Sequence, residues 1–288
     1  AWRLLGHLQN GIGRSNDAIN SFREALRLRP NDVPTINDLL ATLIASGRPE
    51  MALSIARSSE PYANTDPTFM HTWMNLEAAL GDREMVVQKR STLFRVNPDD
   101  RDNAVALAAL YMDAKKFDDA RPIIDSLRAK QDGLDAVNLD AAWHWAQRNF
   151  DKAKQVFESY IAAQGTATVE PLMVFAQFLL QRQDVDGAIA VLNRARPLQD
   201  PKTAAVDRAL ADTYFSLGRL EDTEQACRRV IDAGADTPEK LYRKRLAESL
   251  IGLRRLDEAS AILDPMLAAQ DVDATTMLIA AEARKHRG

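Results

Sequence analysis

The sequence predicts an all-α protein, a right-handed superhelical solenoid of eight helix-turn-helix units followed by a final helix. The first observation is a small residue that returns every 33 to 36 residues, at Ala18, Ala52, Val86, Ala120, Ala153, Ala188, Thr223 and Ala259. A fixed period in this range is the signature of stacked helical repeats. The second is a composition typical of a helical protein, with 46% hydrophobic and 27% charged residues and only 12 glycines and 12 prolines among 288 residues.

The first unit, residues 1–32, carries the repeat pattern most completely. Its marked positions are Trp2, Leu5, Gly6, Gly13, Ala18, Phe22, Ala25 and Pro30. Gly6 and Ala18 are small enough to let two antiparallel helices approach to about 8–10 Å. Gly13 is suited to the left-handed turn that ends the first helix, and Pro30 stops the second.

These spacings match the tetratricopeptide repeat (TPR) pattern, W-x2-L-G followed by G, A, F, A and P, and the chain resembles that family from end to end. The later units are expected over residues 33–66, 67–100, 101–133, 134–168, 169–203, 204–239 and 240–273, with a terminal helix over 274–287. Because each repeat contacts its neighbours, residues 1–288 are expected to form one array.

The later units keep the pattern with substitutions. The small first-helix position holds Leu40, Met74, Ala108, Ala141, Ala176, Ala211 and Ala247. The helix-ending glycine returns as Gly47, Gly81 and Gly218, and its place is taken elsewhere by Lys115, Arg148, Gln183 and Arg254. The third unit departs most, because Arg90 stands where Phe22 stands in the first, and we expect it to be irregularly packed.

Prolines mark several helix starts. Asp66-Pro67, Asp200-Pro201 and Thr237-Pro238 each place an N-capping side chain before a proline at the first helical position. Pro265 instead falls inside a predicted second helix. We expect it to bend or break that helix, because proline lacks the amide donor and clashes with the preceding turn.

The net charge of −4 and the pI of about 5.7 argue against a nucleic-acid partner, which favours a basic surface. No apolar run approaches the roughly 18 residues of a membrane-spanning helix, so membrane insertion is not expected. The chain begins with Ala1, inside a predicted helix, and we interpret it as an excerpt or a processed form. A single cysteine leaves both the cytoplasm and the periplasm open as its compartment. The sequence does not indicate an oligomeric state.

No set of residues suggests catalysis or metal binding. The four histidines lie in different repeats, and no two have metal-ligand spacing. Cys227 occupies the large packing position of its repeat, which predicts a buried structural thiol rather than a nucleophile. We therefore expect no enzymatic activity, no cofactor and no metal.

The resemblance implies that the concave face, lined by the first helices, binds a protein or peptide partner. At one inward position the last five repeats carry large apolar residues, Met112, Trp145, Leu180, Phe215 and Ile251. These residues are either a binding stripe, as an exposed apolar patch would be, or packing residues between adjacent repeats. The sequence alone does not separate the two.

Neighbouring inward positions are polar, and we include in the candidate surface His71, Asn75, Gln177, Arg208, Asp212, Lys244, Arg245 and Glu248. Some TPR proteins clamp a C-terminal carboxylate with Lys and Asn side chains, but the matching basic residues are missing here. Arg208, Lys244 and Arg245 are instead placed to form a local anion-binding spot, which Asp212 and Glu248 would neutralise.

The leading interpretation is an interaction scaffold that holds a partner peptide or helix in its groove. A second is the regulatory or substrate-docking arm of a larger enzyme. A third is an assembly scaffold of a bacterial envelope export or secretion system, and that interpretation depends on family analogy alone.

Overall fold

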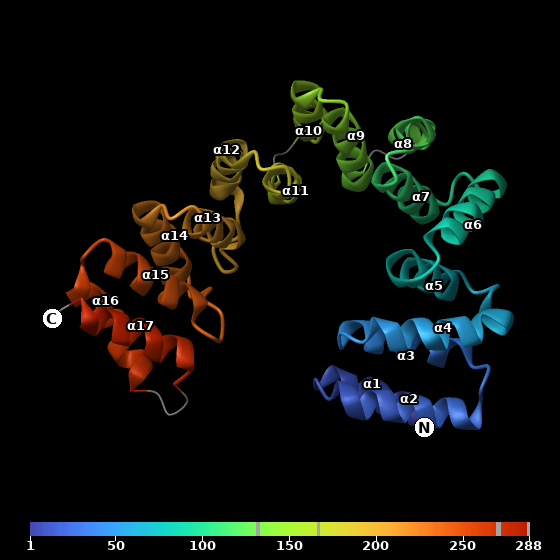
Figure 1. The fold of residues 1–288 in the computed structure, drawn as a ribbon, viewed down its shortest axis with the longest axis horizontal. Coiled ribbons are helices and arrows are strands. Elements are labelled where there is room, and N and C mark those ends of the chain that lie inside the picture. The colour runs from blue at the N-terminus through green and yellow to red at the C-terminus, as the bar shows by residue number, and fades with distance from the viewer. Residues whose placement is uncertain (131–132, 166–167, 269–271, 287–288) are drawn as a thin grey trace. The chain divides into compact units, whose positions relative to one another are not determined.

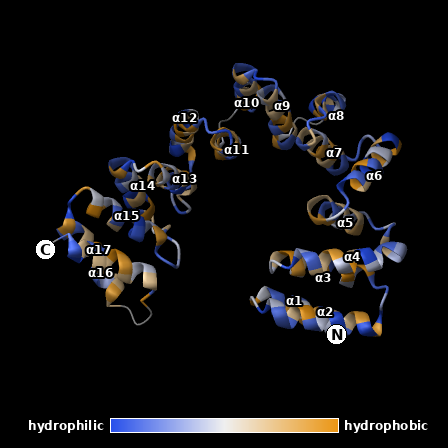
Figure 2. Cartoon of the chain, viewed as in Figure 1, coloured by the Kyte–Doolittle hydropathy of each residue, from blue (hydrophilic) through white to orange (hydrophobic). Residues whose placement is uncertain are grey.

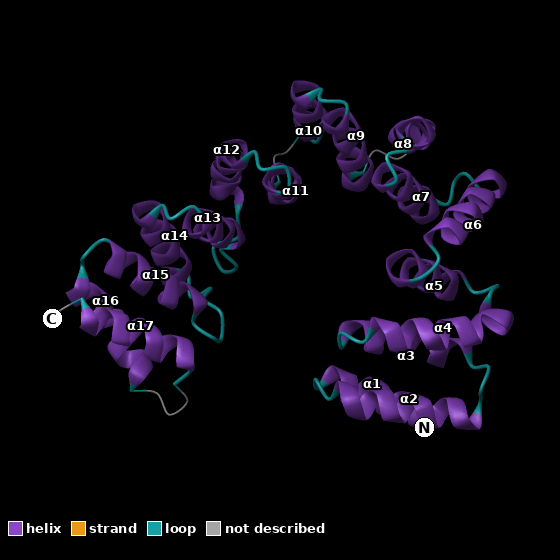
Figure 3. Cartoon of the chain, in the orientation of Figure 1, coloured by secondary structure: helices purple, strands orange, loops and turns teal. Residues whose placement is uncertain are grey.

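The computed structural model describes residues 1–130, 133–165, 168–268 and 272–286. These residues form 17 α-helices and one short 3-10 helix, and no strand occurs among them (Figure 3). The predicted all-α fold is confirmed. In the same ranges, no helix is both long enough and apolar enough to cross a bilayer.

The chain divides into two compact units, Ala1–Gln131 and Asp132–Gly288. The helices of the N-terminal unit are α1 (Trp2–Gly11), α2 (Ser15–Leu28), α3 (Val33–Ala45), α4 (Pro49–Ala63), α5 (Pro67–Leu80), α6 (Arg83–Val96), α7 (Arg101–Asp113) and α8 (Phe117–Lys130) (Figure 1). Those of the C-terminal unit are α9 (Leu134–Ala146), α10 (Phe150–Ala163), α11 (Val169–Leu180), α12 (Val185–Ala195), η1 (Arg196–Leu198), α13 (Ala205–Ser216), α14 (Leu220–Asp232), α15 (Leu241–Gly252), α16 (Leu256–Leu267) and α17 (Ala274–Lys285).

Within each unit, every α-helix packs against the next one along the chain. The first helices of neighbouring pairs also touch, as α3 touches α5, α9 touches α11, α13 touches α15, and α15 touches α17. The helices carry both apolar and polar residues along their length (Figure 2). Each helix can therefore bury an apolar face against its neighbours and leave a polar face in water.

The periodic small residues lie where the helices of a pair cross. All eight residues of the series that runs from Ala18 to Ala259 are fully buried. In the first repeat, a Cβ added at Gly6 would lie 2.5 Å from the Phe22 ring, so this crossing requires a glycine. The spacing of the small residues thus marks positions that are all buried in the helix packing.

Apart from Gly81, which has φ of −127°, the residues at the turns after the first helices share one backbone conformation. Gly13, Gly47 and Gly218 have φ of 77°, 69° and 67°. The residues that replace glycine adopt the same left-handed conformation, with φ of 57° at Lys115, 61° at Arg148, 63° at Gln183 and 62° at Arg254. The turn between the helices of a pair is therefore kept even where the side chain makes it costly.

One of the three predicted N-caps is confirmed. The Asp66 carboxylate accepts a hydrogen bond from the Phe69 amide at 2.7 Å, at the start of α5. The other two are wrong, because α13 and α15 begin several residues after Pro201 and Pro238. In both places the chain first makes a turn that ends in a left-handed residue, Ala204 or Lys240.

Side chains from before these turns take over the capping. The side-chain oxygen of Gln199 accepts hydrogen bonds from the amides of Val206 and Asp207, at 3.0 and 3.2 Å. The Asp236 carboxylate likewise accepts from the Tyr242 amide at 2.9 Å. Amides in the first turns of both helices therefore donate to side chains that lie further back along the chain than an ordinary N-cap residue does.

Pro265 does not break α16, which continues to Leu267. Only two residues of the helix follow the proline. The lost amide donor and the clash with the preceding turn therefore affect only the end of the helix.

Candidate functional site

The predicted apolar stripe occupies equivalent places on successive first helices. In the C-terminal unit, Trp145, Leu180, Phe215 and Ile251 stand in the last turns of α9, α11, α13 and α15. Met112 has the same place at the end of α7 in the N-terminal unit, where it is half-buried. We call the side of α9, α11, α13, α15 and α17 that carries these positions the first-helix face of the C-terminal unit.

The stripe residues differ in how far they are engaged in packing. Ile251 is buried, at 4% exposure. Trp145 and Leu180 are half-buried and pack against the core of the unit. The Trp145 ring lies edge-on to Phe178, with centroids 5.7 Å apart, and 4.6 Å from the Phe150 ring. These three residues therefore have a packing role, whether or not they also meet a partner.

Phe215 is half-buried, and the guanidinium carbon of Arg245 lies 5.2 Å from the centre of its ring. The residue lines a pocket of about 320 Å³ on the first-helix face, together with Glu248, Ile251, Gly252, Arg254, Glu282 and His286. Three residues that the sequence placed inward, Phe215, Glu248 and Ile251, thus meet in one pocket.

Two lining residues of this pocket come from α17 and its end, and the sequence analysis assigned them no role. Glu282 follows the N-cap Asp273 by nine positions, as Asn75 follows the N-cap Asp66. This shared offset is the signal that could have placed Glu282 inward. His286 ends the helix, and its Nδ1 lies 3.0 Å from Nη1 of Arg254.

The pKa of Glu248 is raised above its ordinary value. Partial burial is the main cause, and the negative charge of Glu282 adds to it, while Arg245 acts in the opposite direction. Among the described residues no hydrogen bond or ion pair joins Glu248 to a basic group. Two carboxylates thus face this pocket, and the one on α15 is half-buried.

The basic residues predicted for this face are largely neutralised within the protein. The Lys244 ammonium lies 2.9 Å from a carboxylate oxygen of Asp273. Arg245 forms an ion pair with Asp212. Arg208 is half-buried, and its buried Nε has no hydrogen-bond partner within the described ranges. Asp212 therefore pairs with a neighbouring cation as the sequence suggested, whereas Glu248 forms no ion pair among the described residues and only its charge acts on Arg245.

The remaining predicted polar residues lie on both units. Gln177 is exposed on α11. In the N-terminal unit, His71 Nε2 lies 3.8 Å from a carboxylate oxygen of Asp100. The side-chain oxygen of Asn75 accepts a hydrogen bond from Nη2 of Arg90 at 2.8 Å.

Arg90 explains the irregular third repeat. The side chain is fully buried and fills the place of the aromatic ring in the first repeat. Besides Asn75, Arg90 contacts Asn103. Nη1 of Arg90 donates a hydrogen bond to the Asn103 side-chain oxygen at 3.3 Å, and Nδ2 of the Asn103 side chain donates to the Arg90 backbone carbonyl at 3.0 Å. Burial lowers the pKa of Arg90. The irregularity is a buried polar network within the repeat stack.

Family models of the tetratricopeptide repeat match residues 1–32, 139–200 and 175–238. These segments of the chain carry tetratricopeptide repeats. Residues 33–138, between the matched segments, continue the same succession of helix pairs. No curated protein matches the chain in sequence.

Solved structures agree with this fold. A tetratricopeptide repeat protein from Parabacteroides merdae is similar with a TM-score of 0.59 and 16% identity, over 86% of this chain and 97% of that one. Yeast Tom70 is similar with a TM-score of 0.60 and 13% identity, over 96% of this chain and 59% of that one. At these identities the likeness shows the fold alone. The TPR fold in turn supports a general role as a protein–protein interaction scaffold.

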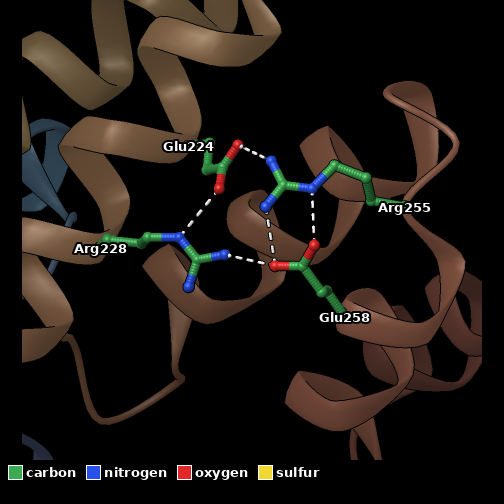
Figure 4. Close-up of polar contacts among 4 residues, drawn as sticks. All are labelled: Glu224, Arg228, Arg255 and Glu258. Atoms are coloured by element: carbon green, nitrogen blue, oxygen red, sulfur yellow. Dashed lines mark hydrogen bonds and ion pairs between the residues drawn. The ribbon is translucent and has the colours of Figure 1, made fainter.

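A closed network of charges lies on α14 and at the start of α16. Figure 4 shows Arg228 bridging Glu224 and Glu258, at 2.9 and 3.0 Å. Arg255 also bridges these two carboxylates, at 2.5 Å to Glu224 and 2.7 Å to Glu258. The network joins α14 to α16, and each of its charges has a partner.

Cys227 is fully buried, as its packing position predicted. Burial raises the pKa of its thiol to about 12. A thiol in this state is a packing residue, because the thiolate is the reactive form. Within the described residues, no group of three or more His, Cys, Asp and Glu side chains is placed to hold a metal ion.

Proposed function

We propose that this chain is an interaction scaffold and that the first-helix face of its C-terminal unit binds a peptide or helix of a partner protein. The observation that carries the proposal is the pocket beside Phe215. An aromatic side chain that is only half-buried lies there next to a half-buried carboxylate. Pockets with apolar walls and a few polar groups are the usual form of a binding site.

The other stripe residues support this proposal through their rigidity. The core holds Trp145 and Leu180, so each presents a fixed apolar edge on the same face as Phe215. Fixed anchors lose little conformational entropy when a partner binds. A segment with apolar side chains at matching intervals would contact all three residues, and Gln177 and Arg208 would supply polar contacts beside them.

The proposal can be tested by site-specific photo-crosslinking of the full chain in its native cells. A photoreactive phenylalanine analogue at position 215 should capture one partner protein, because an anchor site contacts the same partner each time. The matched control is the same analogue at Gln225, an exposed residue of α14 on a second helix. Equal capture at both positions, or capture at neither, would contradict the proposal.

The captured partner then allows a quantitative test. Phe215→Ala should weaken its binding by about 2 kcal/mol, as for a buried aromatic hot spot, with little change in melting temperature. Trp145→Ala should lower both affinity and stability, because Trp145 also packs on Phe150 and Phe178. Unchanged affinity in the Phe215 variant would remove this residue from the site.

A further inference from the structure

The pocket beside Phe215 is unbalanced in charge. Glu248 on α15 and Glu282 on α17 both line it. Against them stand one arginine, Arg254, and the His286 ring, whose Nε2 lies 4.0 Å from a Glu282 oxygen. The charge of Glu282 acts on Glu248. A half-buried carboxylate without a basic partner loses hydration that no contact within the protein returns. A cation that enters the pocket would supply the missing contact.

Two cations near the pocket, Arg245 and Lys244, are paired with other acids. Arg245 pairs with Asp212 and lies against the Phe215 ring. Lys244 pairs with Asp273, and Arg254 contacts the His286 ring. Among the described residues, none of these cations forms an ion pair with Glu248, although the charge of Arg245 acts on it. A positive group that pairs directly with Glu248 would therefore come from outside the described residues.

The walls of the pocket suit the rest of a basic side chain. Phe215 and Ile251 contribute apolar surface, with Gly252 beside them. Lysine and arginine bury their aliphatic stems on such surface and keep the charged head near acceptors. A cation near an aromatic ring gains a further favourable contact.

We propose that this pocket binds a lysine or arginine side chain of the partner segment, with its charged head between Glu248 and Glu282 and its stem on Phe215 and Ile251. This inference rests on the proposed function and adds the chemistry of the partner. The partner would carry one basic residue next to its apolar anchors. Charge pairing of this kind chooses among partners more than it raises affinity.

The test is a selection of short random peptides, about 12 residues long, against the full chain. The selection is run in parallel against the variants Phe215→Ala, the double variant Glu248→Gln with Glu282→Gln, and Glu221→Gln. Glu221 is an exposed acid in the first turn of α14 and serves as the matched control. Melting temperatures show whether each variant is folded, and removal of half-buried charge from Glu248 should not unfold the chain.

Peptides enriched on the wild-type chain should share one lysine or arginine beside apolar residues. Replacement of an essential arginine by citrulline, which keeps the shape without the charge, should weaken binding about tenfold or more. The double variant should bind the arginine peptide and the citrulline peptide equally weakly, whereas Glu221→Gln should bind each of them as the wild type does.

Peptides that need Phe215 but no basic residue, or that bind the double variant normally, would overturn this inference and leave the proposed function standing. Selected peptides that bind the Phe215→Ala variant as well as the wild type would count against both this inference and the proposed function, as would a selection that yields no binder.

Discussion

The Arg57 guanidinium donates hydrogen bonds to both carboxylate oxygens of Glu77, from Nε at 2.7 Å and from Nη2 at 2.8 Å, and so ties α4 to α5. The Trp73 indole and the Asp82 amide donate to the same carboxylate, at 3.3 and 3.2 Å. Glu77 is only 2% exposed. The Arg57 hydrogen bonds are the main reason that the pKa of Glu77 lies below its ordinary value, and the contacts from Asp82 and Trp73 act in the same direction.

This carboxylate should make the stability of the protein depend on acid. Because its pKa is lowered on folding, Glu77 stabilises the protein above its ordinary pKa, and that contribution is lost as the pH falls through the folded value. Glu77→Gln should cost about 2 kcal/mol near pH 7, the size of a lost charged hydrogen bond. In urea unfolding measured between pH 3 and pH 8, the free energy of unfolding of the variant should fall less steeply toward acid pH than that of the wild type. The same dependence on acid pH in the variant and the wild type would rule out this role for Glu77.

Gly81 owes its identity to the same ion pair. Unlike the other helix-ending glycines, it has a negative φ of −127°. A Cβ at this position would lie 2.0 Å from a Glu77 oxygen and 2.7 Å from Nη2 of Arg57. Gly218 contrasts with it, because φ is 67° and nothing lies within 4 Å of an added Cβ.

The two glycines should therefore respond differently to alanine. Gly218→Ala should cost roughly 1–2 kcal/mol of backbone strain at any pH. Gly81→Ala should displace the ion pair and lose part of the acid dependence as well. In a double-mutant cycle with Glu77→Gln, its cost should be less than additive, because the two changes share one interaction. Additive costs would show that Gly81 serves only the turn.

The left-handed residues other than glycine offer an opposite prediction. Gln183 is exposed and lies in the turn after α11, with φ of 63°. Gln183→Gly should raise the free energy of unfolding by about 0.5–1 kcal/mol, since relief of strain exceeds the added flexibility of glycine in the unfolded chain. Gln183→Ala, which keeps the Cβ, should give no such gain. Thermal or urea unfolding of the two variants shows whether the gain in stability comes from the relaxed backbone or from the loss of the glutamine side chain.

The sequence predicts those parts of the fold that depend on local spacing. The small residues from Ala18 to Ala259 recur with the length of the helix pair, so the register follows from counting. The starts of α13 and α15 do not follow, because their caps come from Gln199 and Asp236 across a left-handed turn. A proline after Asp200 or Thr237 favours an earlier start, and only the folded turn shows that the helix begins later.

The candidate site shows the same division. The inward register of Phe215, Glu248 and Ile251 can be counted from the repeat, and these residues do meet in one pocket. The ion pairs on this face do not follow from the repeat spacing, because pairs such as Arg245 with Asp212 join side chains of different repeats. Glu282 was missed because no inward position was assigned to the terminal helix.

The thiol of Cys227 should resist modification in the folded protein. Its burial and its raised pKa leave almost no reactive thiolate near pH 8. A coloured thiol reagent should react with one thiol per chain in denaturant and with almost none in native buffer, and the sequence has no other cysteine to confuse the count. Rapid reaction of the native protein would contradict the packing position assigned to Cys227.

The helix crossings provide a direct test of the repeat packing. Ala153 on α10 and Ala188 on α12 are fully buried in the core of the C-terminal unit, whereas Ala163 is exposed at the end of α10. Ala153→Leu and Ala188→Leu should each cost roughly 1–3 kcal/mol, because the added atoms must push two helices apart. Ala163→Leu should change the free energy of unfolding by less than about 0.5 kcal/mol, as for an ordinary surface position. All three variants keep the charge and the helix propensity nearly unchanged, so differences between their urea unfolding curves report on packing. Equal losses at the three positions would mean that the crossings are not set by these small residues.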